Sequence, residues 1–194
     1  MISILAIAVV AIVDTGVRCA HLQCLDGYDN RNDGMGHGTI VATIAQQTCP
    51  SCKILPVKIY DKGRIDVADL ERGLRWVKRW KQVHKRASLV VNLSMQTRDR
   101  LPVSLRKVIR DIKRLGVPVV AAAGNGGLNT LKIPEVLLVG SLDSTGQKKS
   151  WSNDGDLYTV AQEFPDAVFQ RGTSYSAPVV SAILARGKKA NETH

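Results

Sequence analysis

The fold is decided near the start of the chain by residues 4–16, ILAIAVVAIVDTG. Ten consecutive apolar residues (4–13) lead directly into Asp14, Thr15 and Gly16. A continuous apolar run is typical of a strand buried on both faces, as in a parallel sheet covered by helices. The run is too short to span a bilayer, and no lysine or arginine precedes it as in a signal peptide. We therefore expect a core strand and a cytoplasmic protein, with secretion as the alternative.

The rest of the chain alternates strand patterns with amphipathic helix patterns. Further strands are predicted at residues 53–60, 88–94, 117–123, 136–141 and 157–161, and helices at 39–47, 66–86, 101–115 and 174–186. Asp66 is the expected N-cap of the longest helix, and Gly116 is the expected C-cap of the next. This alternation predicts an α/β fold of three layers, a mostly parallel central sheet with helices on both faces. We expect one domain over residues 1–187 and a polar tail at 188–194.

The composition is that of a globular protein with an unusually basic surface. The 194 residues are 44% hydrophobic and carry a net charge of +10, much of it on the predicted helices 66–86 and 101–115. Solvated outer helix faces are the simplest interpretation, and a docking face for an acidic partner is the alternative. The aromatic content is 5% and no nucleic-acid motif is present, so a nucleic-acid partner is disfavoured. No membrane partner is expected.

Four cysteines form two close pairs, Cys19 with Cys24 and Cys49 with Cys52. Three interpretations remain open: reduced structural thiols, one or two disulfides, and a four-cysteine zinc site. The zinc site is disfavoured because the spacing of the first pair is wide. We therefore expect no metal and no cofactor.

Two titratable residues lie at glycine-rich junctions. Asp14 follows the first strand, and functional sites of α/β sheets form at the carboxyl ends of the strands. His37 lies between Gly36 and Gly38 at the start of a predicted helix, and its imidazole has the side-chain pKa closest to neutral pH. A carboxylate that holds an imidazole in one tautomer is one part of a catalytic triad. Either residue alone also fits a structural role, as a loop cap or a packed histidine.

A hydroxyl and an amide complete this set of groups. Ser174 lies just before Pro178, which places it near a helix N-terminus, where free N–H groups and the helix dipole favour an anion. Asn125 follows Gly124 at the end of another predicted strand, where its amide could donate to an oxyanion. Taken alone, Ser174 could be an N-cap and Asn125 a turn residue.

Four segments, in this order along the chain, resemble the motifs of subtilisin-like serine proteases. They are residues 11–16 (AIVDTG), 36–42 (GHGTIVA), 119–127 (VVAAAGNGG) and 172–178 (GTSYSAP). The resemblance covers nearly the whole chain and implies a serine endopeptidase that acts on a protein or peptide substrate. It implies Ser174 as the nucleophile, His37 as the general base, Asp14 as its orienting carboxylate and Asn125 as an oxyanion donor.

The same resemblance implies where a substrate would bind. Two strand edges would pair with the peptide, and one wall would form the main specificity pocket; their residues would be Ser94, Met95 and Gln96, then Gly63 and Arg64, then Ala122, Ala123 and Gly124. Gln96 stands where the family usually has glycine, and the segment after Asn125 is short. A catalytically silent peptide-binding protein is therefore the alternative function.

Two further expectations concern the helix that follows His37. The insertion that usually carries a calcium loop is missing after it, so no tight calcium site is expected there. In the fold that the resemblance implies, this helix would carry Cys49 and Cys52 far from Cys19 and Cys24.

Overall fold

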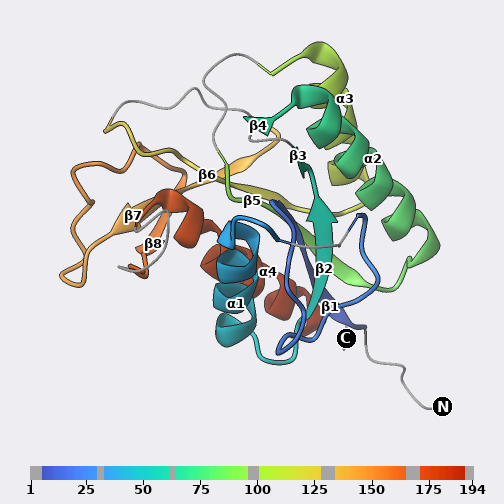
Figure 1. Cartoon of the computed structure of the whole chain (residues 1–194), viewed down its shortest axis with the longest axis horizontal. Coiled ribbons are helices and arrows are strands. Elements are labelled where there is room, and N and C mark those ends of the chain that lie inside the picture. Colours follow the sequence, from blue (N-terminus) through green and yellow to red (C-terminus); the bar gives the residue numbers. More distant parts are fainter. Residues whose placement is uncertain are drawn as a thin grey trace.

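The computed structural model describes residues 6–29, 33–61, 64–95, 101–127, 134–164 and 171–190. Its centre is a six-stranded parallel sheet with the strand order β2-β1-β5-β6-β7-β8 (Figure 1). These strands are β1 (Ala8–Asp14), β2 (Lys53–Lys58), β5 (Ser88–Leu93), β6 (Val119–Ala122), β7 (Leu137–Leu142) and β8 (Leu157–Val160). The predicted parallel sheet is confirmed.

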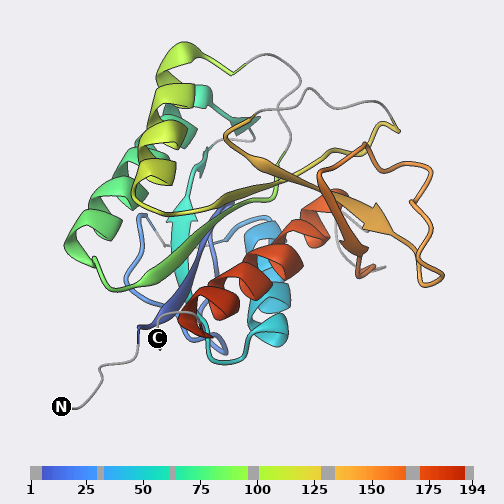
Figure 2. The same cartoon turned by 180° about the vertical axis from the view of Figure 1, so that it is seen from behind.

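Helices cover both faces of this sheet (Figures 1 and 2). One face packs against α2 (Val67–Val83) and α3 (Val103–Arg114), and the other against α1 (His37–Thr48) and α4 (Ala177–Ala190). Every residue of β1 is buried, and its side chains alternate between the two layers. This explains the uninterrupted apolar run, because both faces of the strand need apolar side chains. The predicted three-layer α/β fold is confirmed.

Asp66 caps the start of α2 and Gly116 ends α3, as predicted from the sequence. The Asp66 carboxylate accepts a hydrogen bond from the backbone N–H of Ala68 at 2.9 Å, as expected of an N-cap. Gly116 follows the end of α3 with a φ of +73°, a conformation that glycine adopts without strain. Within the described ranges, no helix is both long enough and apolar enough to cross a membrane.

The strand predicted at residues 53–60 ends two residues early. After Lys58, the backbone N–H of Ile59 donates to the carbonyl of Asp14 at 3.0 Å. The chain then leaves the sheet, and β3 (Tyr60–Asp61) pairs with β4 (Arg64–Ile65) in a separate antiparallel hairpin. The chain around Tyr60 is thereby turned toward the end of β1 rather than along β2.

The helix predicted at residues 174–186 also begins differently. A 3₁₀ turn, η1 (Thr173–Tyr175), comes first, and the α-helix starts at Ala177. Pro178 has no N–H to donate to the carbonyl of Ser174 four residues earlier. The hydroxyl of Ser94 donates to this carbonyl instead, at 2.7 Å. Ser174 is therefore fixed to the end of β5 as well as to its own turn.

All four cysteines are in disulfides, Cys19–Cys24 and Cys49–Cys52. The expectation that the two pairs lie far apart is wrong. The segment around Cys24 runs alongside β2, where Gln23 and Leu25 exchange backbone hydrogen bonds with Ile54. The side chain of Gln23 also donates to the carbonyl of Pro50, inside the second disulfide loop. The two loops are neighbours because this segment returns to the end of the sheet that α1 reaches.

The basic residues of α2 and α3 are largely paired with carboxylates. Arg72 pairs with Asp69 and Arg75 with Glu71, while Asp111 binds three cations, Lys78, Lys107 and Arg114. Hydrogen bonds from Lys78 and Lys107 lower the pKa of Asp111 to about 2. This pairing fits a solvated outer face.

Candidate active site

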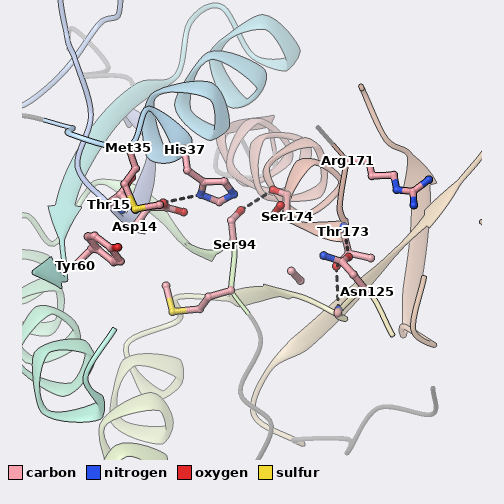
Figure 3. Close-up of a pocket in the computed structure, with 13 residues that line it drawn as sticks. Asp14, Thr15, Met35, His37, Tyr60, Ser94, Asn125, Arg171, Thr173 and Ser174 are labelled. Carbon is pink, nitrogen blue, oxygen red and sulfur yellow. Dashed lines mark hydrogen bonds and ion pairs between the residues drawn. The ribbon is translucent and has the colours of Figure 1, made fainter. Parts of the chain in front are cut away.

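Asp14 and His37 meet where the end of β1 approaches the start of α1. The Asp14 carboxylate is 3% exposed, and its Oδ1 accepts hydrogen bonds from His37 Nδ1 and from the backbone N–H of Thr15, both at 2.8 Å (Figure 3). A carboxylate at neutral pH can only accept, so Nδ1 of His37 carries the proton. In the neutral imidazole, Nε2 is then the nitrogen with a lone pair. This is the tautomer that a general base needs.

The protonated form of His37 is favoured by the charges around it. Burial alone would lower the pKa of the imidazole. The hydrogen bond to Asp14 and the negative charges of Asp14 and Asp33 outweigh this effect and raise the pKa of His37 above its ordinary value. An imidazolium that forms during a reaction is therefore stabilised at this position.

The glycine beside His37 allows the two segments to touch. A Cβ atom on Gly38 would lie 2.1 Å from the carbonyl oxygen of Gly16 and 3.1 Å from Cβ of Asp14. No side chain fits in that space, so a residue other than glycine would push α1 away from β1. The second glycine of the Gly-His-Gly pattern thus has a steric cause, namely the close approach that brings His37 to Asp14, whereas the first, Gly36, has a φ of +78°.

Ser174 lies on the other side of the imidazole. Its residue is 9% exposed and sits in η1, and Figure 3 shows the His37 ring between Asp14 and Ser174. The Ser94 hydroxyl that donates to the Ser174 carbonyl itself accepts from the side-chain amide of Asn92 at 2.9 Å. The main chain at Ser174 is therefore tied to β5, which runs next to the strand that ends at Asp14.

Asn125 is held with its amide nitrogen toward Ser174. Its Oδ1 accepts from the backbone N–H of Thr173 at 2.9 Å and from the Thr173 hydroxyl at 3.1 Å. Because Thr173 binds the oxygen, the other atom of the amide, Nδ2, is fixed in position and stays available as a donor. A Cβ on Gly172 would lie 3.0 Å from Asn125 Nδ2 and 3.1 Å from Ser174 Oγ, so both atoms flank Gly172. An amide donor and a hydroxyl thus share one side of the turn.

Tyr175 packs beneath this group as a fully buried residue. Its ring centroid lies 5.7 Å from that of His37 and 5.1 Å from that of Phe164. Burial and the nearby charge of Asp14 raise the pKa of Tyr175, so its hydroxyl stays neutral. The ring forms an apolar base under the imidazole.

Asp14, His37, Asn125 and Ser174 line a cavity of about 230 Å³ (Figure 3). Besides the four residues predicted from the chemistry, its lining includes Thr15, Met35, Tyr60, Ser94, Met95, Ala122, Gly124, Arg171 and Thr173. Four of the residues predicted to bind substrate therefore line it: Ser94, Met95, Ala122 and Gly124. Ala123 does not, because its side chain alternates to the other side of the chain and packs in the core against α2 and α3.

The remaining predicted contacts are not placed. Gln96 and Gly63 lie outside the described residues, as does the side chain of Arg64, whose backbone belongs to β4.

Five cavity residues were not predicted from the sequence: Thr15, Met35, Tyr60, Arg171 and Thr173. Thr15 and Thr173 adjoin Asp14 and Ser174, and this adjacency was the signal that could have found them. Within the described ranges, no cluster of three histidine, cysteine or acidic side chains could hold a metal ion.

Comparison with known proteins identifies the family. A model of the subtilase family of peptidases matches residues 7–193, so the chain belongs to that family. Over 212 aligned residues it is 28% identical to M-protease from Shouchella clausii (strain KSM-K16), with 94% of this chain and 54% of M-protease covered. It is also 28% identical to subtilisin BL from Lederbergia lenta, over 94% of this chain and 76% of that protein.

The fold comparison agrees. A cold-adapted subtilisin-like serine proteinase superimposes with a TM-score of 0.78 at 26% identity, covering 95% of this chain and 77% of that one. A lanthipeptide protease superimposes with a TM-score of 0.79 over 96% of this chain and 74% of that one. Its 19% identity supports the shared fold alone. The chain spans only about half the length of M-protease.

Proposed function

We propose that this protein is a serine endopeptidase that hydrolyses peptide bonds through an acyl-enzyme. The observation that carries the proposal is the 2.8 Å hydrogen bond from His37 Nδ1 to Asp14, with Ser174 on the far side of the ring. Membership of the subtilase family and the similarity to subtilisins support the same reaction.

In the proposed mechanism, Ser174 Oγ attacks the carbonyl carbon of the scissile peptide bond while its proton passes to Nε2 of His37. The C=O electron pair becomes an oxyanion, which accepts a hydrogen bond from Nδ2 of Asn125. When this intermediate collapses, the C–N bond breaks and His37 returns the proton to the leaving amine. The product is an ester between Ser174 and the acyl half of the substrate, and water cleaves it by the same steps.

The charge distribution fits this sequence of events. His37 becomes cationic in both transition states, and the buried carboxylate of Asp14 faces it from the opposite side to Ser174. Because Asp14 is fixed by Thr15 before the reaction starts, little reorganisation is needed when the charge develops. The protein thus supplies an oriented base and a preorganised amide donor.

Hydrolysis of fluorescein-labelled casein tests this function. Wild type should release fluorescent peptides, and Ser174→Ala should release none above background. Ser176→Ala is the matched control: it lies two residues away, and its buried hydroxyl bonds to Ser141 rather than facing the cavity. A folded wild type that binds casein peptides without cleaving them would reject the proposal in favour of a silent peptide-binding protein.

A further inference from the structure

Asp33 is a buried carboxylate that the proposed reaction does not use. It is 0% exposed and accepts four hydrogen bonds. Oδ1 accepts from the Thr15 hydroxyl and the backbone N–H of Gly36, both at 2.8 Å. Oδ2 accepts from the backbone N–H of Thr39 at 2.8 Å and from its hydroxyl at 2.5 Å. A buried charge with this many donors is fully satisfied rather than strained.

These bonds connect the two segments that carry Asp14 and His37. Thr15 directly follows Asp14, and its hydroxyl also accepts from the backbone N–H of Gly38 at 3.0 Å. Gly36, Gly38 and Thr39 surround His37 at the start of α1. Asp33 and Thr15 thus bridge the end of β1 to the first turn of α1 on both sides of the Asp14–His37 pair.

Asp33 also replaces the missing cap of α1. Gly36 occupies the N-cap position and has no side chain to accept from the first turn. Asp33 accepts from Gly36 and Thr39, and Thr15 accepts from Gly38, so three of the four orphan N–H groups at the start of the helix are satisfied by side chains outside it. The negative charge lies at the positive end of the helix dipole, where it is favoured.

A third connection reinforces this arrangement. The guanidinium of Arg18 donates twice to the Asp33 carbonyl, at 2.9 and 3.1 Å, and the Arg18 backbone N–H donates to the Thr39 hydroxyl at 3.0 Å. The Asp33 carbonyl and the Thr39 side chain are therefore both held against the loop that follows β1. Removing the Asp33 carboxylate would leave that loop attached to α1 by fewer hydrogen bonds.

We propose that Asp33 is a positioning residue, which sets the geometry of the Asp14–His37 hydrogen bond by locking the end of β1 to the start of α1. This inference rests on the proposed function for its effect on catalysis. Its effect on His37 itself does not depend on catalysis and can be measured separately.

The pH dependence of His37 reports on this role because the charges that act on the ring are identified among the described residues. Asp14 from β1 and Asp33 from the loop before α1 raise its pKa, the ring of Tyr175 from η1 packs beside it, and Arg171 lies elsewhere on the cavity wall. Tyr175 is neutral at working pH. Loss of the Asp33 charge would therefore lower the pKa of His37, and displacement of Asp14 would lower it further.

The experiment compares Ser174→Ala with Ser174→Ala/Asp33→Asn by NMR, and wild type with Asp33→Asn by kinetics. We expect the pKa of His37 to fall in the double variant and its Nδ1 proton resonance to move upfield or broaden. In the kinetic pair, kcat on fluorescein-casein should fall about 10- to 100-fold with little change in KM, as expected from misplacement of a catalytic group. A folded Asp33→Asn with an unchanged His37 pKa and an unchanged kcat would overturn the inference.

A milder pair covers the case in which Asp33→Asn does not fold. Thr39→Val removes the hydroxyl that bonds Asp33, whereas Thr39→Ser keeps it. We expect a lower kcat and a lower His37 pKa in Thr39→Val, with both restored in Thr39→Ser. Equal values in the two variants would overturn the inference. If wild type itself shows no turnover, the NMR comparison still decides the role of Asp33, so failure of the proposed function is distinguishable.

Discussion

Thr173 holds the side-chain amide of Asn125 by its oxygen, through two hydrogen bonds of 2.9 and 3.1 Å. The Thr173 hydroxyl also accepts from the backbone N–H of Gly124 at 2.9 Å, so it is itself fixed. The residue before the proposed nucleophile therefore orients the proposed oxyanion donor. This couples Asn125 and Ser174, which lie 49 positions apart in the sequence.

The first prediction concerns this amide. Asn125→Ala should lower kcat by about 10²- to 10³-fold, the loss known for the corresponding group in a subtilisin, with KM little changed. Thr173→Val keeps the backbone donor to Oδ1 and loses the hydroxyl, so its loss should be smaller. Steady-state kinetics on a fluorogenic peptide would measure both. Thr43→Val is the control, because its hydroxyl bonds within α1. An unchanged kcat in Asn125→Ala would remove Asn125 from the mechanism.

The second prediction concerns the charge of Asp14. Asp14→Asn keeps the shape of the side chain but loses the carboxylate that raises the pKa of His37. We expect kcat to fall by about 10⁴-fold, as for a triad whose imidazole has the wrong tautomer. The ascending limb of the residual pH–rate profile should move to lower pH, since the base then loses its proton more easily. A limb that stays in place would contradict the assigned pairing.

The third prediction is a pH dependence of stability. Because the pKa of folded His37 is raised above its unfolded value, its ionic contribution is fully present below the unfolded pKa of about 6.5. It is lost as the pH rises through the higher folded pKa. The difference in unfolding free energy between wild type and His37→Ala should therefore shrink as the pH is raised from 5 toward 9, apart from a constant packing contribution. Urea denaturation at several pH values measures this, and a difference that grows with pH would refute it.

The fourth prediction separates structure from activity at Ser94. Ser94→Ala removes the donor to the Ser174 carbonyl that Pro178 cannot provide. We expect a loss of about 1–3 kcal/mol in stability and a lower kcat. Ser88→Ala is the matched control, because this serine is also buried and donates to a distant carbonyl, that of Ala185. It should lose stability without losing activity, and equal effects of the two variants on kcat would contradict the account.

The disulfides give a fifth prediction. Each closes a very short loop, so its loop-closure contribution is about 2 kcal/mol. The double variant Cys49→Ala/Cys52→Ala should lose about this much stability, and Cys19→Ala/Cys24→Ala should lose a similar amount. Guanidinium unfolding of the oxidised protein measures it. Free thiols in the native, unreduced protein, found by alkylation and mass spectrometry, would show that the bonds do not form.

The sequence predicts the sheet well because its strands have a local signature. The apolar run before Asp14 and the glycines around His37 are each visible within a few residues, and the structure gives both a steric or packing cause. Asp33 has no such signature. Its importance comes from Thr15, eighteen residues earlier, so only the fold brings the two together.

The errors of detail have similar origins. Ser174 was expected in the first turn of a helix, but it lies in the 3₁₀ turn η1, which ends before α4 begins. Pro178 and the Ser94 hydroxyl favour this turn. Ala123 was expected in the cavity wall, but its side chain alternates into the core. The two disulfide loops were expected to be apart, but pairing with β2 brings them together. For Ser174 and for the disulfide loops, a contact distant in sequence overrides the local pattern.

The most direct test of the central claim is labelling with a fluorophosphonate followed by mass spectrometry. This reagent phosphonylates a serine only when a base and an oxyanion site activate it. We predict one adduct, on the peptide that contains Ser174, that is absent in Ser174→Ala and strongly reduced in His37→Ala. No adduct on the folded wild type, or an equal adduct in Ser174→Ala, would contradict the assignment of Ser174 as the nucleophile.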